Sequence, residues 1–274
     1  MDRFQFCVWL LGGSTLAAWP ASLLAQAATK GSQLDTASAV DLAGRLRMLS
    51  QRITKTYLQV GQSIATAQAA LILHASIKQF ESHLGTLQAF QPTPAVRSAM
   101  AHLATQWRYF KAQLVAPPSE QGANMLYDAN EALQQAAHRS TVAYENVSTA
   151  PLDHLIGIAG RQRMLTQRMA KFYFYRTWGL YDAPSNMELY LSRAHFTAVL
   201  PAIENSPFVS ERVKAHVAQV RRVWEPYQQV LFASQNPAQM RNEAERVAEL
   251  SEVVLVTTDE LVALLLAQAQ GIAL

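Results

Sequence analysis

The chain has 274 residues, of which 50% are hydrophobic and 16% charged, and its formal net charge is +3. This size is enough for one large core or two small ones, and so small a positive charge argues against nucleic acid as a partner. The single cysteine, Cys7, excludes an intrachain disulfide, and its place near the N-terminus argues against thiolate catalysis and thiolate metal sites. The seven histidines do not form the E-x-x-H pairs of a di-iron bundle, so we expect no metal and no other cofactor.

The N-terminal segment predicts export from the cytoplasm. Its only basic residue is Arg3, an apolar stretch broken by two glycines and a proline follows, and Ala25-Gln26-Ala27 ends the segment. This order is typical of a cleavable signal peptide over residues 1–27, and an uncleaved membrane anchor is the alternative. We therefore expect a periplasmic protein.

The remainder of the chain is an internal repeat. Leu42–Tyr57 and Ile158–Tyr173 are 116 positions apart and share ten of sixteen residues, most of them polar. The repeat continues with Phe80 and Phe196 at the same offset, and with Trp107 and Trp224, then Leu133 and Leu250, at an offset of 117. An ordinary duplicated helix keeps its apolar stripe rather than its polar residues. We assign residues 28–147 and 148–274 to two copies of one domain.

Apolar residues recur at helical spacing almost throughout, so the sequence predicts an all-α protein. The predicted helices cover residues 35–63, 67–90, 94–115, 120–146, 151–180, 185–204, 207–233 and 236–270. Short connections predict that each copy is an up-down-up-down four-helix bundle, and we expect a pseudo-two-fold axis to relate the two. Ser148 or Thr149 is expected to cap the helix that begins at Pro151.

The first helix of each copy carries an arginine on a face of small residues. At about 100° per residue, Arg47 lies roughly 130° from the apolar stripe of its helix, beside Gly44, Ser50 and Gln51. The second copy places Arg163 beside Gly160, Thr166 and Gln167 in the same way. Such faces suit close approach of another helix. If the two first helices meet, Arg47 and Arg163 face each other.

Two opposed guanidinium groups favour an anion between them. At about 4 Å and an effective dielectric near 20 they repel by roughly 4 kcal/mol, and an interposed anion reverses that sign. The planar donor fork suits oxyanions, and association entropy limits the expected affinity to the micromolar to millimolar range. The candidate ligand-binding residues are Arg47, Arg163, Gln51, Gln167, Ser50 and Thr166.

Other residues of the repeated segment have less specific interpretations. Four further arginines could assist the ligand, cover the core with their stems or pair with carboxylates: Arg45, Arg52, Arg161 and Arg168. Met48 and Met164 are read as packing residues that could form an apolar wall beside the ligand. Lys55 and Lys171 are expected to be solvated, and the aromatic residues between Phe172 and Tyr181 to pack the core.

The segment A-G-R-x-R-M-L-[ST]-Q-R, at residues 43–52 and 159–168, resembles the signature of PilJ/NarX-type sensory domains. These are the N-terminal domains of type IV pilus methyl-accepting receptors and of nitrate/nitrite sensor kinases. In the nitrate sensors, the arginine before the methionine binds the anion from each of two related first helices. The resemblance therefore implies that Arg47 and Arg163 bind nitrate or nitrite. Leu46, which stands where the second copy has Gln162, departs from the pattern.

Family receptors continue into a second membrane helix and a signalling module, and neither follows here. We therefore expect a non-enzymatic binding protein that clamps a small oxyanion, nitrate or nitrite, and acts through a membrane sensor, a transporter or a pilus-related partner. The alternative is a structural module of a pilus or envelope complex, in which the arginines dock a partner's carboxylates. An enzyme is the third option, but the sequence contains no recognisable set of nucleophile, base and orienting group.

Overall fold

The computed structural model describes residues 34–272, and the predicted signal peptide lies outside them. The described residues are helical without strands, which confirms the all-α prediction. The helices are α2 (Thr36–Gly61), α3 (Thr66–Gln88), α4 (Pro94–Ala112), α5 (Glu120–Glu145), α6 (Pro151–Thr177), α7 (Asp182–Glu204), α8 (Glu211–Leu231), α9 (Pro237–Asn242) and α10 (Ala244–Ala269). Between residues 34 and 272, no helix is both long and apolar enough to cross a membrane.

Local sequence explains where most of these helices begin. Side chains of Asp35, Thr93, Ser119 and Ser210 accept hydrogen bonds from the first turns of α2, α4, α5 and α8. The helix at Pro151 begins where expected, but the predicted cap is wrong, because its N-cap is Ala150 and no side chain caps it. Proline at the first position already removes one of the donors that a cap would satisfy.

The last predicted helix, residues 236–270, is divided into α9 and α10. Asn236 caps α9, and the chain leaves regular geometry at Glu243 before α10 starts. This short extra helix has no counterpart in the first half of the described chain. Because of it, the residues of α10 that are equivalent to residues of α5 lie further along the chain than the sequence repeat predicts, as the ion pairs of Glu131 and Glu252 show.

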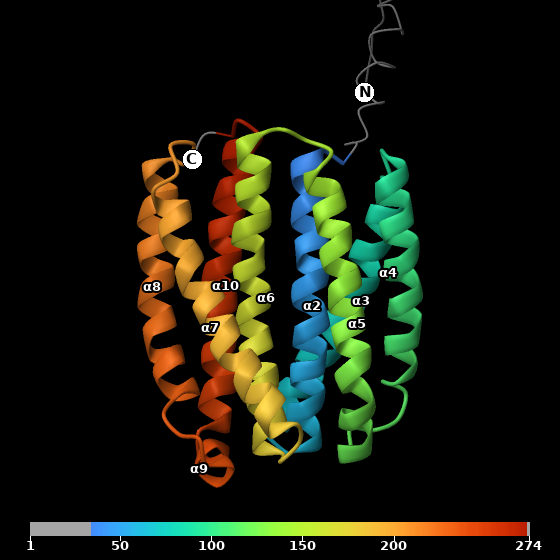
Figure 1. Cartoon of the computed structure of the whole chain (residues 1–274), viewed down its shortest axis with the longest axis vertical. Helices are drawn as coiled ribbons and strands as arrows, with labels where there is room; N and C mark the ends of the chain where they lie inside the picture. Colours follow the sequence, from blue (N-terminus) through green and yellow to red (C-terminus); the bar gives the residue numbers. More distant parts are fainter. Residues whose placement is uncertain (1–33, 273–274) are drawn as a thin grey trace, which may run out of the picture. The chain divides into compact units, whose positions relative to one another are not determined.

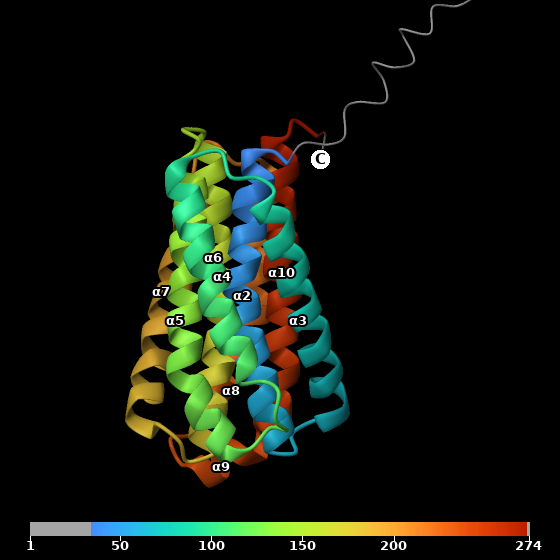
Figure 2. The same ribbon diagram turned by 90° about the vertical axis from the view of Figure 1, so that its right-hand side faces the viewer.

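Two parallel helices, α2 and α6, form the centre of the unit (Figure 1). α2 packs against α3 and α5, whereas α6 packs against α7 and α10. Across the seam between the halves, α10 also contacts α2, and α5 contacts α6. The view in Figure 2 shows the first half from its outer side, with α4 in front of α2. The first helix of each repeat thus contacts the other, as the small-residue faces predicted.

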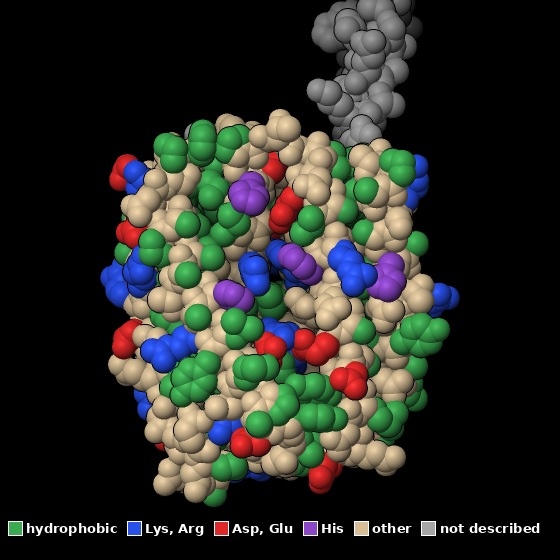
Figure 3. Space-filling model, in the orientation of Figure 1, with side chains coloured by type: hydrophobic (Ala, Val, Ile, Leu, Met, Phe, Trp, Pro, Cys, Tyr) green, Lys and Arg blue, Asp and Glu red, His purple; other side chains and the backbone are tan. Residues whose placement is uncertain are grey.

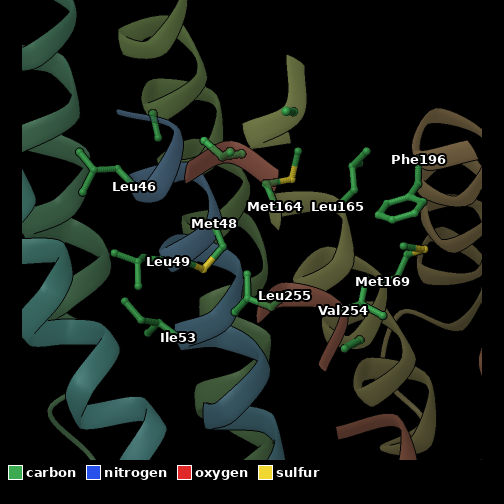
Figure 4. Close-up of a cluster of buried hydrophobic side chains, with 14 of the residues drawn as sticks. Leu46, Met48, Leu49, Ile53, Met164, Leu165, Met169, Phe196, Val254 and Leu255 are labelled. Atoms are coloured by element: carbon green, nitrogen blue, oxygen red, sulfur yellow. The ribbon is translucent and has the colours of Figure 1, made fainter. Parts of the chain in front are cut away.

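The two halves repeat their internal packing. Phe80 stacks on Trp107 with ring centroids 4.0 Å apart, and the equivalent Phe196 stacks on Trp224 at 4.3 Å. Buried aliphatic and sulfur-containing side chains, including Leu49 of α2 and Leu165 of α6, continue the core across the central helices (Figure 4). The pseudo-two-fold axis and the exact domain boundaries remain predictions.

Candidate functional site

The seam between α2 and α6 brings Arg47 and Arg163 together inside the protein. Their exposed fractions are 2% and 0%. A β-carbon at Gly44 would lie 3.4 Å from Nη2 of Arg163 and 3.6 Å from Nη2 of Arg47, so these two nitrogens are no more than 7.0 Å apart (3.4 plus 3.6 Å). A β-carbon at Gly160 would also approach both groups, at 3.2 and 3.9 Å. The small residues of the repeated segment therefore make room for two guanidinium groups.

Arg163 is neutralised by carboxylates from two helices. Its Nη1 donates to Asp259 of α10 at 2.6 Å, and its Nη2 donates to Asp41 of α2 at 2.7 Å. Arg45 pairs with the same two aspartates. Burial raises the pKa of Asp41, but the charges of Arg163 and Arg45 outweigh burial and hold that pKa below its usual value.

Arg47 has no such compensation. Its Nη2 donates to the backbone oxygen of Gly157 at 3.1 Å, and its Nη1 lies 3.3 Å from Nδ1 of His138. Within residues 34–272 no carboxylate forms an ion pair with Arg47, and its buried Nε has no hydrogen-bond partner. Two of its five donors are therefore used. Burial, assisted by the charges of Arg163 and Arg161 and opposed by that of Glu145, lowers the pKa of Arg47 to about 10.

The difference between the arginines follows from two substitutions between the repeats. Asp41, which pairs with Arg163, is replaced 116 positions later by Gly157, beside Arg47. Asp259 is likewise replaced by His138, 121 positions earlier. Burial, followed by the charge of Arg47, lowers the pKa of His138, so its ring is neutral at neutral pH and can accept from the guanidinium. A pair of carboxylates on one side thus corresponds to a glycine and an imidazole on the other.

Glu145 is the carboxylate whose charge favours ionised Arg47 most. Its Oε1 occupies the space over Gly157, 1.9 Å from where a β-carbon would lie, and burial raises its pKa. Three arginines (Arg45, Arg47 and Arg163) and three carboxylates (Asp41, Glu145 and Asp259) balance, and the nearby exposed Arg161 brings the formal charge to +1. Figure 3 shows basic, acidic and histidine side chains gathered around a hollow in the middle of one face.

The predicted amide and hydroxyl groups are buried near the arginines but bond elsewhere. Gln51 donates to Asn130 of α5, and Gln167 donates to the backbone oxygen of Ser251 in α10. The hydroxyls of Ser50 and Thr166 donate to carbonyls of their own helices. Within the described part of the chain, the Oε1 atoms of both glutamines remain unpartnered. These four residues line the seam without contacting either guanidinium group through a hydrogen bond.

The remaining residues of the repeated segment fill structural roles. Met48 and Met164 are buried in the core, as Figure 4 shows. Arg52 pairs with Glu252, and Arg168 pairs with Glu131 and Glu188. Arg161 is exposed.

The prediction that Lys55 and Lys171 are solvated is wrong, because each is only 1% exposed. Each ammonium group crosses the seam to the other half, where Lys55 pairs with Glu252 and Lys171 with Glu131. Burial lowers the pKa of Lys171 to about 8 despite Glu131, whereas the charges of Lys171 and Arg168 outweigh burial and bring the pKa of Glu131 to about 2. Helical periodicity shows only that a side chain points away from the core of its own bundle. It does not show that helices of the other half cover these two lysines.

These ion pairs also correct the sequence alignment of the last helices. Glu131 and Glu252 play the same role at an offset of 121, and so do Asn130 and Ser251, which bond to Lys171 and Lys55. Leu133 and Leu250, which the sequence aligns at an offset of 117, therefore do not occupy equivalent positions in the structure, and that prediction is wrong. The additional residues around α9 account for the change.

Sequence reasoning missed the burial of Gln162, which replaces Leu46 in the second half. Gln162 is fully buried, and both of its side-chain polar atoms lack a partner among residues 34–272. Leu46 at the equivalent position is packed in the core. The signal was present in the sequence, since the repeat aligns an amide with a leucine, but only the structure shows that the amide lacks a hydrogen-bond partner in the described part of the chain.

Comparison with known families agrees with this architecture. The family model of the N-terminal domain of type IV pili methyl-accepting chemotaxis transducers (PilJ) matches residues 29–137 and 153–247. The chain belongs to the PilJ family. No curated protein and no solved structure matches it. The two matched segments correspond to the two repeats, so the chain contains a tandem arrangement of a sensory domain of chemotaxis transducers.

Proposed function

We propose that this chain is a periplasmic, non-enzymatic sensory protein that binds a small oxyanion, nitrate or nitrite, between α2 and α6 and signals through a partner protein. The observation that carries the proposal is Arg47, a buried guanidinium group with unused donors and without a carboxylate partner among the described residues. An isolated buried charge is unfavourable unless something pairs with it.

The surrounding charges favour a monovalent ligand. With the exposed Arg161 counted, the cluster carries a formal charge of +1, which one nitrate or nitrite ion would neutralise. The separation of at most 7.0 Å between the two Nη2 atoms is one that a single small anion can span with hydrogen bonds of about 2.8 Å on each side. Arg47 supplies most of the free donors, whereas Arg163 is held in place by Asp41 and Asp259.

Binding at this position couples the ligand to the arrangement of the two halves. The anion would reduce repulsion between groups that belong to α2 and α6, the helices that join the repeats. A ligand that binds one arrangement better shifts the population toward it. A membrane sensor, a transporter or a pilus-related protein could read that shift, because the sensory domains of this family belong to transducers.

Calorimetric titration with nitrate and nitrite tests the proposal. The wild-type chain is expected to bind with micromolar to millimolar affinity. Arg47→Ala should abolish detectable binding, and Arg163→Ala should weaken it at least tenfold. Arg108→Ala, at an exposed position on α4, removes the same charge and should leave the affinity unchanged. Unchanged affinity in both seam variants would refute the proposal, and a protein partner lost with either arginine but indifferent to anions would favour the structural alternative.

A further inference from the structure

A cavity of about 410 Å³ lies between α2, α3 and α10. These helices run beside one another in Figure 2. Lys55 and Gln59 of α2 line it, together with Ala65 at the start of α3 and Ala248 of α10. Its volume falls in the range of small-molecule sites. Neither Arg47 nor Arg163 lines this cavity.

At the equivalent positions of α5, α6 and the loop before α7, tyrosines take the place of the residues that line this cavity. Gln59 and Ala65 correspond to Tyr175 and Tyr181 at the offset of 116, and Ala248 corresponds to Tyr127 at the offset of 121. Tyr127 stacks on Tyr181 with centroids 3.9 Å apart and meets Tyr175 edge-on at 5.2 Å. Three rings on one side of the molecule are thus replaced by two alanines and a glutamine on the other.

The backbone confirms that these positions are equivalent. Ala65 and Tyr181 both occupy the left-handed region, with φ of 43° and 50°, at the residue before α3 and before α7. Two residues earlier, Ser63 and Gly179 also have positive φ, 57° and 73°. The loops therefore have the same local conformation. The cavity arises from side-chain replacement and not from a different chain path.

Polar groups at the inner end of the cavity have unused hydrogen-bonding capacity. Gln59 is 3% exposed, and its Oε1 has no partner within residues 34–272. The ammonium of Lys55 donates to Ser251 and Glu252, which leaves one of its three donors. In the second half the corresponding ammonium, Lys171, lies 4.0 Å from the ring of Phe172, but Thr56 replaces that ring beside Lys55. An amide group of a ligand would use both, because its N–H can donate to Oε1 of Gln59 and its oxygen can accept from Lys55.

The rest of the cavity combines apolar walls with acidic residues. Ala69 and Ile72 of α3 contribute aliphatic surface, and Glu245 and Glu249 of α10 are exposed carboxylates at its border. Since Glu252 already pairs with Lys55, these two carboxylates are free to attract a positive charge. The arrangement thus has an inner polar end, an aliphatic middle and an anionic border.

We infer that this cavity is a second ligand site, which binds a short aliphatic ammonium compound with an amide group at its inner end. The amide N–H donates to Gln59 and the amide oxygen accepts from Lys55, the carbon chain lies against the alanines and Ile72, and the ammonium group lies near Glu245 and Glu249. The inference does not depend on oxyanion binding at Arg47. A chain with both sites would report on two chemically different solutes.

Calorimetry of the full chain with ω-amino amides of three to six carbons tests this inference. We expect at least one, such as 5-aminopentanamide, to bind with micromolar to millimolar affinity. Pentanamide, which lacks the ammonium group, and pentylamine, which lacks the amide group, should each bind at least tenfold more weakly. Absence of binding by the whole series, or equal binding of pentanamide, overturns the inference.

Variants that introduce the tyrosines of the equivalent positions test whether the ligand binds in this cavity. The double variant Ala65→Tyr with Ala248→Tyr should abolish binding, while Val256→Tyr, at an exposed position of the same helix, should leave it unchanged. Arg47→Ala should also leave it unchanged, which separates this site from the proposed oxyanion site. Gln59→Leu should weaken binding at least fivefold and provides the same test if the double variant does not fold. Binding that survives both the filling and the glutamine substitution overturns the assignment.

Discussion

Replacing each seam arginine by methionine should change stability in opposite directions. Burial brings the pKa of Arg47 to about 10 from 12.5, which corresponds to about 3 kcal/mol against its charged form. Because the pKa of this cation is depressed, the cost is present at neutral pH and is relieved only as the pH rises through about 10. Methionine removes the cost but loses the hydrogen bonds to His138 and Gly157, each of about 1 kcal/mol. We expect Arg47→Met to increase the free energy of unfolding by about 1 to 2 kcal/mol.

Arg163→Met provides the matched comparison at the equivalent position. It leaves Asp41 and Asp259 without their buried partner, although Arg45 still pairs with both. Breaking a buried pair in this way typically costs about 3 to 5 kcal/mol, and the remaining arginine places the expected loss at the lower end of that range. Urea unfolding followed by far-ultraviolet circular dichroism, in buffer without nitrate or nitrite, measures both changes. Equal losses in the two variants, or a loss above about 1 kcal/mol in Arg47→Met, would refute the charge asymmetry.

Three further results are expected. Gln162→Leu, which copies Leu46, should raise the free energy of unfolding by about 1 to 3 kcal/mol because a buried amide without partners is removed; a loss in urea unfolding would show that the amide has a partner. The pKa of Glu252 falls from 4.5 to about 2 on folding, so its stabilisation of about 3 kcal/mol is present above pH 4.5 and is lost as the pH falls toward 2. Thermal unfolding across this range should show the loss, and Glu252→Gln should have lower stability at neutral pH with a flatter acid dependence; an unchanged slope would contradict the assignment. Glu145→Gln should strengthen nitrate binding on the order of tenfold, about 1.4 kcal/mol, since it removes the carboxylate that competes for Arg47; weaker binding in calorimetry would place Glu145 in the ligand site.

The sequence alone determined the helical repeat and the direction in which its arginines point. Apolar spacing and the proline and capping signals predicted helices that agree with the structure to within a few residues at most ends, and wheel geometry placed Arg47 and Arg163 away from the core. Both inferences concern single helices. Spacing along one helix is sufficient for them because side-chain direction is set by the local backbone.

Only the tertiary structure decided which groups compensate each charge. Lys55 and Lys171 become buried because glutamates from the opposite half reach them, and Arg47 has no ion pair within residues 34–272 because Gly157 and His138 stand where Arg163 has aspartates. These contacts join residues on different helices, and their register depends on the extra residues around α9. The periodicity of one helix carries no information about the helix opposite, so neither the charge asymmetry nor the cavity beside Gln59 could be read from the sequence.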